Sequence, residues 1–156
     1  MKDQAGGRAV AAKFSNPVFT ADGALRASVA LRNPQTLWFN TGSLCNIECV
    51  NCYLASSPTN DALVYISADE VSQYLDQLSM RAWPVTEIGF TGGEPFMNPE
   101  MIEMARRCLA RGYKVLILTN AMRPMMRDAM RRGLLGLIST FGQRLTIRVS
   151  LDHWAA

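Results

Sequence analysis

The chain has 156 residues, of which 49% are hydrophobic and 19% are charged. This apolar fraction is enough for one domain with its own core, and it excludes a disordered or collagen-like protein. The formal net charge of +3 is too small to indicate a nucleic acid as a partner.

Neither a membrane span nor a secretory signal is predicted. The longest aliphatic runs, such as Val115 to Leu118, contain only a few residues, whereas a bilayer-spanning helix needs roughly 20. The first 14 residues are interrupted by Gly6, Gly7 and Arg8 and lack the apolar centre of a signal peptide. We therefore expect a cytoplasmic protein.

Residues 1–34 are predicted to form an N-terminal arm, and residues 35–156 the core domain. Residues 1–16 mix glycine, alanine and isolated charges without any period. After them, Phe19-Thr20 and Leu25 to Leu31 are compatible with a small hairpin, because Asp22-Gly23 suits a tight turn that requires positive φ.

The core domain shows four strand-like segments. The third is almost entirely apolar, as expected of a parallel strand that is covered on both faces. The four segments are Thr36 to Thr41, Thr86 to Phe90, Tyr113 to Thr119 and Leu145 to Leu151.

A first helix is predicted after residue 66, where Ser67 followed by Glu70 forms a capping box. Its apolar stripe should consist of Val71, Tyr74, Leu75 and Leu78.

A second helix is predicted to begin with Asn98 as its cap and Pro99 as its first helical residue, and to stop at Gly112. Its buried side should consist of Met101 or Ile102, Ala105, Cys108 and Leu109.

A third helix is predicted from Pro124 to about Arg132, with a resumption after Gly133. The alternation of strands and helices predicts an α/β fold with a parallel sheet and right-handed crossovers, either doubly wound or part of a barrel. In both architectures the reactive loops follow the carboxyl ends of the strands.

Chemically suggestive residues follow every predicted strand, and we therefore expect them at one rim of the sheet. They are the cysteines between Cys45 and Cys52, the segment Thr91 to Pro95, Thr119-Asn120, and Ser150 to Asp152.

Three of the four cysteines, Cys45, Cys49 and Cys52, lie within eight residues of each other. Three thiolates in one short loop can hold a metal ion or a cluster. The alternative is a helix that buries all three in the core. The preceding Gly42 and the polar residues between the thiols favour the loop.

A zinc site is a second alternative, with His153 or Cys108 as the fourth ligand. Cys108 lies on the predicted apolar stripe, where a buried thiol is the ordinary interpretation, and a lone histidine near the chain end is usually a surface or packing residue. An iron-sulfur cluster needs no fourth protein ligand, because three thiolates leave one iron of a four-iron cluster open.

The spacing Cys45-x3-Cys49-x2-Cys52 resembles the signature of the radical S-adenosylmethionine (radical SAM) superfamily. A second motif follows the second strand and is similar to the superfamily's GGEP motif, which contacts the methionine amino group of the cofactor. This motif is Gly92, Gly93, Glu94 and Pro95.

Two further segments are similar to the family's ribose and carboxylate contacts, namely Asn120 with the preceding threonine, and Ser150 with Asp152. Tyr53 follows the third cysteine, whereas many members carry an aromatic before it; Asn51 stands there instead, so adenine stacking is not expected from this place. The resemblance covers roughly residues 36 to 152.

The resemblance implies a partial (β/α) barrel of the radical SAM type with about four of its six strand-helix units. The chain ends just after the fourth strand, so we expect a core domain that is incomplete at its C-terminus.

The resemblance also implies a 4Fe-4S cluster on the three cysteines and S-adenosylmethionine at the glycine motif, where Glu94 or a neighbouring carbonyl would accept from its ammonium group. In the implied mechanism, the reduced cluster cleaves S-adenosylmethionine to a 5′-deoxyadenosyl radical, which abstracts hydrogen from an unidentified small molecule or peptide. The competing hypotheses are an inactive fragment of such an enzyme and a non-catalytic metal module, either zinc-stabilised or carrying a cluster for electron transfer or sensing.

Basic residues are predicted on the exposed faces of the second and third helices. Such faces are usually only solvated, but these could also receive an acidic electron donor such as flavodoxin or ferredoxin. They are Arg106, Arg107, Arg111, Arg127, Arg131 and Arg132.

Overall fold

The computed structural model describes residues 16–20 and 22–151. Its contacts divide the chain into two units, residues 1–32 and 33–156. In the first unit one antiparallel bridge joins Phe19 to Leu25, across a turn in which Gly23 has a φ of 83°. The predicted hairpin is therefore limited to this one pair, because residues 26–31 form no strand. Residues 1–15 and residue 21 of the predicted arm lie outside the described residues.

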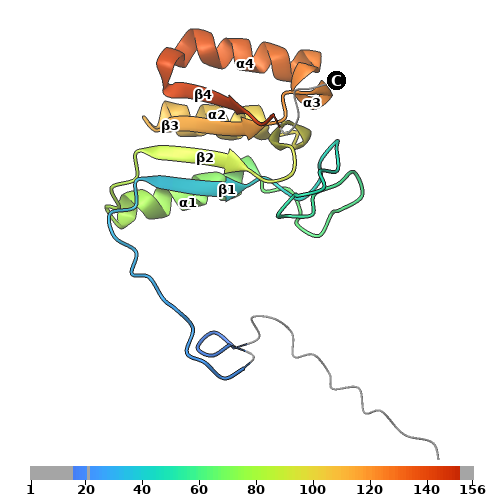
Figure 1. Ribbon diagram of the computed structural model, residues 1–156. Helices are drawn as coiled ribbons and strands as arrows, with labels where there is room; N and C mark the ends of the chain where they lie inside the picture. Colours follow the sequence, from blue (N-terminus) through green and yellow to red (C-terminus); the bar gives the residue numbers. More distant parts are fainter. Residues whose placement is uncertain (1–15, 21, 152–156) are drawn as a thin grey trace, which may run out of the picture. The chain divides into compact units, whose positions relative to one another are not determined.

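The second unit is built on one four-stranded parallel sheet with strands in chain order, β1-β2-β3-β4 (Figure 1). All four predicted strands are confirmed, with ends shifted by at most two residues. They are β1 (Thr36–Asn40), β2 (Glu87–Thr91), β3 (Lys114–Thr119) and β4 (Leu145–Val149).

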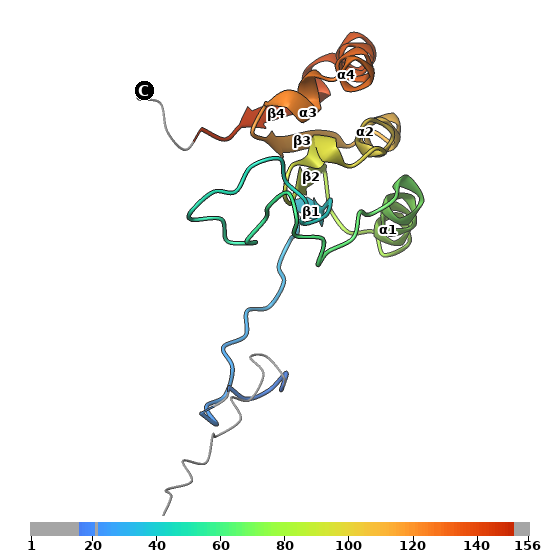
Figure 2. The same cartoon turned by 90° about the vertical axis from the view of Figure 1, so that its right-hand side faces the viewer.

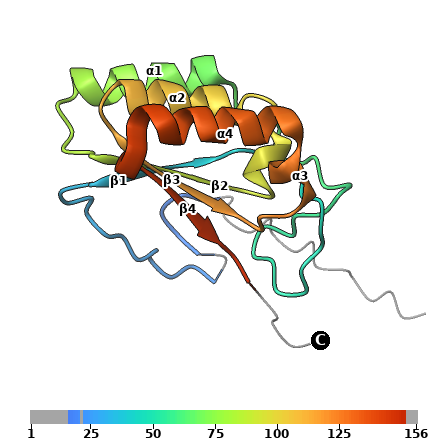
Figure 3. The same cartoon turned by 90° about the horizontal axis from the view of Figure 1, so that it is seen from above.

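All three long helices lie on the same face of this sheet (Figures 2 and 3). A doubly wound sheet would carry helices on both faces, whereas strands in chain order with helices on one side are typical of a (β/α) barrel. The partial-barrel fold is thereby confirmed. The long helices are α1 (Ala68–Met80), α2 (Met101–Ala110) and α4 (Asp128–Phe141), and the short ones are η1 (Pro95–Met97), α3 (Arg123–Met126) and η2 (Gly142–Arg144).

The core lies between the sheet and these helices. Alternate strand residues such as Phe39, Ile88 and Phe90 point into it and are buried. Leu116 and Leu118 on β3 are only half-buried, so the prediction that this strand is covered on both faces is wrong for the described part of the chain. No helix in the described residues is long and apolar enough to cross a membrane.

Helix α1 confirms the predicted capping box. Ser67 Oγ accepts from the Glu70 N–H at 3.2 Å, and the Glu70 carboxylate accepts from the Ser67 N–H at 2.8 Å. Tyr74 is 49% exposed and therefore does not belong to the buried stripe. Ala68 is buried instead, together with Val71, Leu75 and Leu78.

Helix α2 begins two residues later than predicted, and Asn98 is not its cap. Glu100 precedes the helix, and Asn98 instead ends η1. The buried Asn98 amide donates to the carbonyl oxygens of Thr41 and Ile66, at 3.2 and 2.8 Å. The residue therefore joins the loop after β1 to the start of α1.

The break in the third helical segment is at Arg127, between α3 and α4, and not at Gly133 as predicted. Gly133 lies inside α4, where a Cβ atom would approach Ile102 Cγ2 to 2.7 Å. This glycine therefore permits close packing of α4 on α2 and does not interrupt the helix.

Candidate functional site

The loops after β1 and β2 are joined through their backbones at the carboxyl edge of the sheet. The Gly93 N–H donates to the Gly42 carbonyl at 2.8 Å, and the Glu94 N–H donates to the Leu44 carbonyl at 3.0 Å. A Cβ atom on Gly93 would lie 2.0 Å from the Leu44 oxygen, and one on Gly92, whose φ is 133°, would lie 2.6 Å from Asn40 Oδ1. Both glycines are therefore required by this close approach.

Glu94 extends the junction to the loop after β3. Its side chain is 1% exposed. One carboxylate oxygen accepts from Thr119 Oγ1 at 2.8 Å and from the Phe96 N–H at 3.1 Å. The other accepts from the Asn120 N–H at 2.9 Å. The carboxylate thus fixes two loops from inside the protein, a role that the sequence did not predict.

Asn120 connects the same edge to the cysteine loop. Its amide nitrogen donates to Asn46 Oδ1 at 3.0 Å and lies 3.8 Å from Cys45 Sγ. The sequence did not predict this contact of Asn46. The signal that could have indicated it is the position of Asn46 directly after the first cysteine.

Ser150 also reaches this edge, because its N–H donates to the Thr119 carbonyl at 2.8 Å. The predicted convergence of the four segments is therefore confirmed as far as Ser150. Asp152 and His153 lie outside the described residues.

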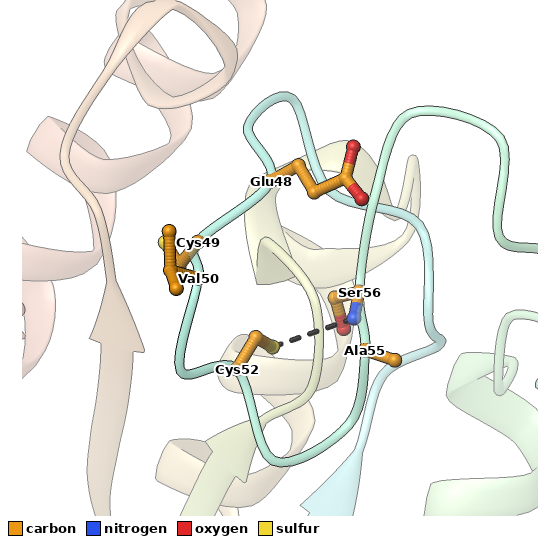
Figure 4. A pocket seen from close by; sticks show the side chains of 6 residues that line it. All are labelled: Glu48, Cys49, Val50, Cys52, Ala55 and Ser56. Carbon is orange, nitrogen blue, oxygen red and sulfur yellow. Dashed lines mark hydrogen bonds between the residues drawn. The ribbon is translucent and has the colours of Figure 1, made fainter.

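The cysteines lie on an irregular loop, so the alternative in which a helix buries all three is wrong. A parallel bridge between Leu44 and Ser57 closes the base of this loop. Cys45 is buried, whereas Cys49 and Cys52 are half-buried and line an open cavity of ≈ 400 Å³ (Figure 4).

Two thiols of the loop, Cys45 and Cys52, and the thiol of Cys108 on α2 differ in their environments. Burial, together with the nearby charges of Glu94 and Cys52, raises the pKa of Cys45. The pKa of Cys52 is lowered, chiefly because the Ser56 N–H donates to its sulfur at 3.4 Å. Cys108 is fully buried in the core, which confirms it as a core thiol and argues against it as a zinc ligand; this burial raises its pKa to about 12.

The donor set of the loop fits an iron-sulfur cluster, because thiolates are the usual ligands of such clusters. Within residues 16–20 and 22–151, however, no three histidine, cysteine, aspartate or glutamate side chains are gathered closely enough to hold a metal ion. The fold thus places the three thiols in one loop without gathering them into a formed metal site.

The basic surface is smaller than the sequence suggested. Arg106 and Arg107 both pair with Glu103, and Arg107 also pairs with Asp69 on α1. Arg111 pairs with Asp76 at 2.8 Å. The predicted basic face of the second helix is therefore largely neutralised within the chain.

Comparison with known proteins agrees with this geometry. The model of the radical SAM superfamily matches residues 39–152, which include the cysteine loop and the glycine motif. The chain belongs to the radical SAM superfamily. Members of this family use a 4Fe-4S cluster and S-adenosylmethionine.

Two curated proteins are similar to this chain in sequence. The antilisterial bacteriocin subtilosin biosynthesis protein AlbA of Bacillus subtilis (strain 168) is 34% identical over 108 residues, which are 69% of this chain and 22% of AlbA. The AdoMet-dependent heme synthase of Methanosarcina barkeri (strain Fusaro / DSM 804) is 29% identical over 93 residues, or 59% of this chain and 26% of the synthase. The chain thus spans about a quarter of their length.

Solved structures show the same fold. SuiB of Streptococcus suis bound to S-adenosylmethionine superposes with a TM-score of 0.60 at 20% identity, covering 76% of this chain and 25% of SuiB. SuiB bound to its precursor peptide SuiA gives a TM-score of 0.60 at 21% identity, over 76% and 24% of the two chains.

Proposed function

We propose that this chain is the cluster- and cofactor-binding part of a radical SAM enzyme that acts on a peptide. The observation that carries the proposal is the junction of three strand-end loops around Glu94, because the first of these loops, after β1, carries the three thiols. A metal module without catalysis would have no use for this junction.

Cys45, Cys49 and Cys52 would hold the 4Fe-4S cluster. When bound and reduced, the cluster supplies the electron that cleaves S-adenosylmethionine and so gives a 5′-deoxyadenosyl radical for hydrogen abstraction. The chain's own part is to hold the cysteine loop, which follows β1, against the glycine loop, Gly92 to Pro95. It does so through the backbone hydrogen bonds of Gly93 and Glu94.

S-adenosylmethionine would be held by Gly92 to Pro95, with Asn120, Ser150 and Asp152 as further contacts. The Glu94 carboxylate already accepts three hydrogen bonds from the chain. We therefore assign recognition of the ammonium group to backbone carbonyls of the glycine loop, and to Glu94 the positioning of that loop.

A peptide is the substrate class that two similarities support. AlbA is named for bacteriocin biosynthesis, and SuiB has been solved with its precursor peptide.

An acidic flavodoxin or ferredoxin would deliver the electron in the cytoplasm, where thiols remain reduced. Its docking surface would be reduced to Arg127, Arg131 and Arg132, since the arginines of α2 are paired.

Anaerobic reconstitution with iron and sulfide tests the proposal. We expect the visible absorbance of a thiolate-ligated iron-sulfur cluster and formation of 5′-deoxyadenosine after reduction with dithionite. Cys49→Ala should abolish both signals, whereas Cys108→Ala should retain them, because Cys108 lies in the core. Zinc binding without either signal would instead establish the metal module.

The substrate class is tested separately. Formation of 5′-deoxyadenosine should be stimulated by members of a synthetic precursor-peptide library and not by an iron porphyrin, the compound class for which the similar heme synthase is named. Stimulation by the porphyrin alone would contradict a peptide substrate and leave the radical SAM assignment intact.

A further inference from the structure

Ser56 carries an unpaired buried hydroxyl within the cysteine loop. Ser56 is 3% exposed. Among the described residues, Ser56 Oγ is the single buried side-chain oxygen or nitrogen atom that has no hydrogen-bond partner. An unpaired buried hydroxyl destabilises a fold. Such an atom in a native protein therefore indicates a partner that binds there or a functional role.

The position of Ser56 indicates what that partner is. Its backbone N–H already donates to Cys52 Sγ at 3.4 Å, and Ser56 lines the same cavity as Cys49 and Cys52. Figure 4 shows the Ser56 side chain on the inner side of the loop, the side that Cys52 also faces. The unpaired hydroxyl and the donating N–H thus belong to one residue beside one thiol.

The adjacent Ser57 shows what a structural serine in this loop looks like. Its Oγ accepts from the N–H groups of Thr59 and Asn60, at 3.3 and 3.1 Å. These bonds fix the turn that follows the loop. Ser56 Oγ makes no comparable bond, although both serines are buried.

We propose that Ser56 is a positioning residue for the bound cluster, with its hydroxyl donating a hydrogen bond to the Cys52 thiolate or to an adjacent cluster sulfide. The proposal rests on the function proposed above. Hydrogen bonds to cluster sulfurs are among the factors that set the reduction potential. Since the reduced cluster carries one more negative charge, the donor stabilises the reduced state more and raises the potential.

The test compares Ser56→Ala with the unmodified 156-residue chain, in two measurements that should move in opposite directions. In the iron-free protein, Ser56→Ala should unfold at the same temperature or higher, because it removes an unpaired buried hydroxyl. In the reconstituted protein, the equilibrium constant for one-electron reduction should fall at least threefold, or by about 30 mV at 59 mV per tenfold change. A dithionite titration followed by electron paramagnetic resonance measures this potential.

Two control variants separate a cluster role from a structural one. Ser56→Thr keeps the hydroxyl and should keep the potential. Ser57→Ala should lower the unfolding temperature of the iron-free protein, because it removes two acceptor contacts, and should leave the potential unchanged.

The outcomes are distinguishable. If the unmodified chain takes up no iron and sulfide, the proposed function fails. If it loads a cluster and Ser56→Ala has the same potential, the inference on Ser56 is overturned while the function stands. An equal shift in Ser57→Ala would also overturn it, because the cause would then be a general disturbance of the loop.

Discussion

The cysteine loop and the glycine loop lie at the same edge of the sheet, but they are built differently. In the glycine loop, Gly92 to Pro95, the two glycines are half-buried and Glu94 and Pro95 are buried. Glu94 and backbone hydrogen bonds tie this loop to both neighbouring loops. The cysteine loop is closed at its base by Leu44 and Ser57, while its tip exposes Val50 completely and Tyr53 by 80%.

This difference indicates how the site is assembled. The glycine loop owes its geometry to the fold, whereas the three thiols share a loop without being gathered into a metal site. A metal that binds such a loop contributes its binding energy to ordering it. We infer that the cofactor side is formed in advance and that the cluster side is completed by the cluster.

Replacing the central carboxylate should have the largest effect on the glycine loop. Glu94→Ala leaves the buried donors of Thr119, Phe96 and Asn120 without their acceptor. We expect the free energy of unfolding to fall by about 3 kcal/mol, measured by urea denaturation of the iron-free chain. Glu94→Gln keeps one acceptor and should lose less. A loss below about 0.5 kcal/mol, the range of an ordinary surface substitution, would show that the glycine loop is no better fixed than the cysteine loop.

A methyl group between the two loops should be the next most disruptive change. Gly93→Ala places a Cβ atom 2.0 Å from the Leu44 oxygen, and the loops must separate. We expect a loss of about 2 kcal/mol in unfolding free energy together with weaker binding of S-adenosylmethionine, measured by urea denaturation and calorimetry.

Gly136→Ala is the matched control, because an added Cβ on this helical glycine would meet no atom within 4 Å apart from its chain neighbours and the backbone of its own helix. It should stabilise the chain by about 0.5–1 kcal/mol through the better helix propensity of alanine. If both variants behaved alike, the close approach of the two loops would not be limiting.

The cysteine loop should respond to metal where the glycine loop does not. Reconstitution with iron and sulfide should slow cleavage between residues 46 and 55 by at least about tenfold, which corresponds to about 1.4 kcal/mol of local protection. Limited proteolysis with chymotrypsin, which can cleave at Tyr53, measures the rate. Chelation should restore cleavage, and Cys49→Ala should not be protected. Equal cleavage rates in the iron-free protein and in the protein loaded with a cluster would mean that the cysteine loop is also formed in advance.

The sequence was sufficient to predict the edge at which the site lies. Apolar runs located the four strands, and the carboxyl ends of parallel strands must meet at one edge. It was not sufficient to predict the role of Glu94, because three donors reach its carboxylate from two loops whose distance depends on the packing of the whole sheet.

The wrong predictions have a common physical cause: the same residue type at the same local position can serve more than one structural role. Asn98 matches a helix cap, but η1, which begins at Pro95, places the Asn98 amide between two distant carbonyls. Gly133 matches a helix break, but the proximity of Ile102 gives it a packing role. The arginines of α2 match a free basic face, and only the fold reveals the carboxylates of α1 opposite them.

An exposed carboxylate on the helical layer should show the smallest effect. Hydrogen bonds from Arg106 and Arg107 lower the pKa of Glu103 from 4.5 to about 2. Because the pKa is lower in the folded state, the stabilisation is fully present above pH 4.5 and is lost as the pH falls toward 2. The Glu103 side chain is 37% exposed, so screening limits its contribution to less than about 1 kcal/mol.

Glu103→Gln should therefore reduce the free energy of unfolding by less than about 1 kcal/mol at neutral pH, and this difference should vanish in about 1 M salt. Urea denaturation at both ionic strengths measures it. The penalty of Glu94→Ala should persist at high salt, because its carboxylate is buried and its partners are screened much less. If salt removed both penalties equally, the carboxylate at the centre of the glycine loop would be solvated in solution, and the loop would not be formed before the cluster binds.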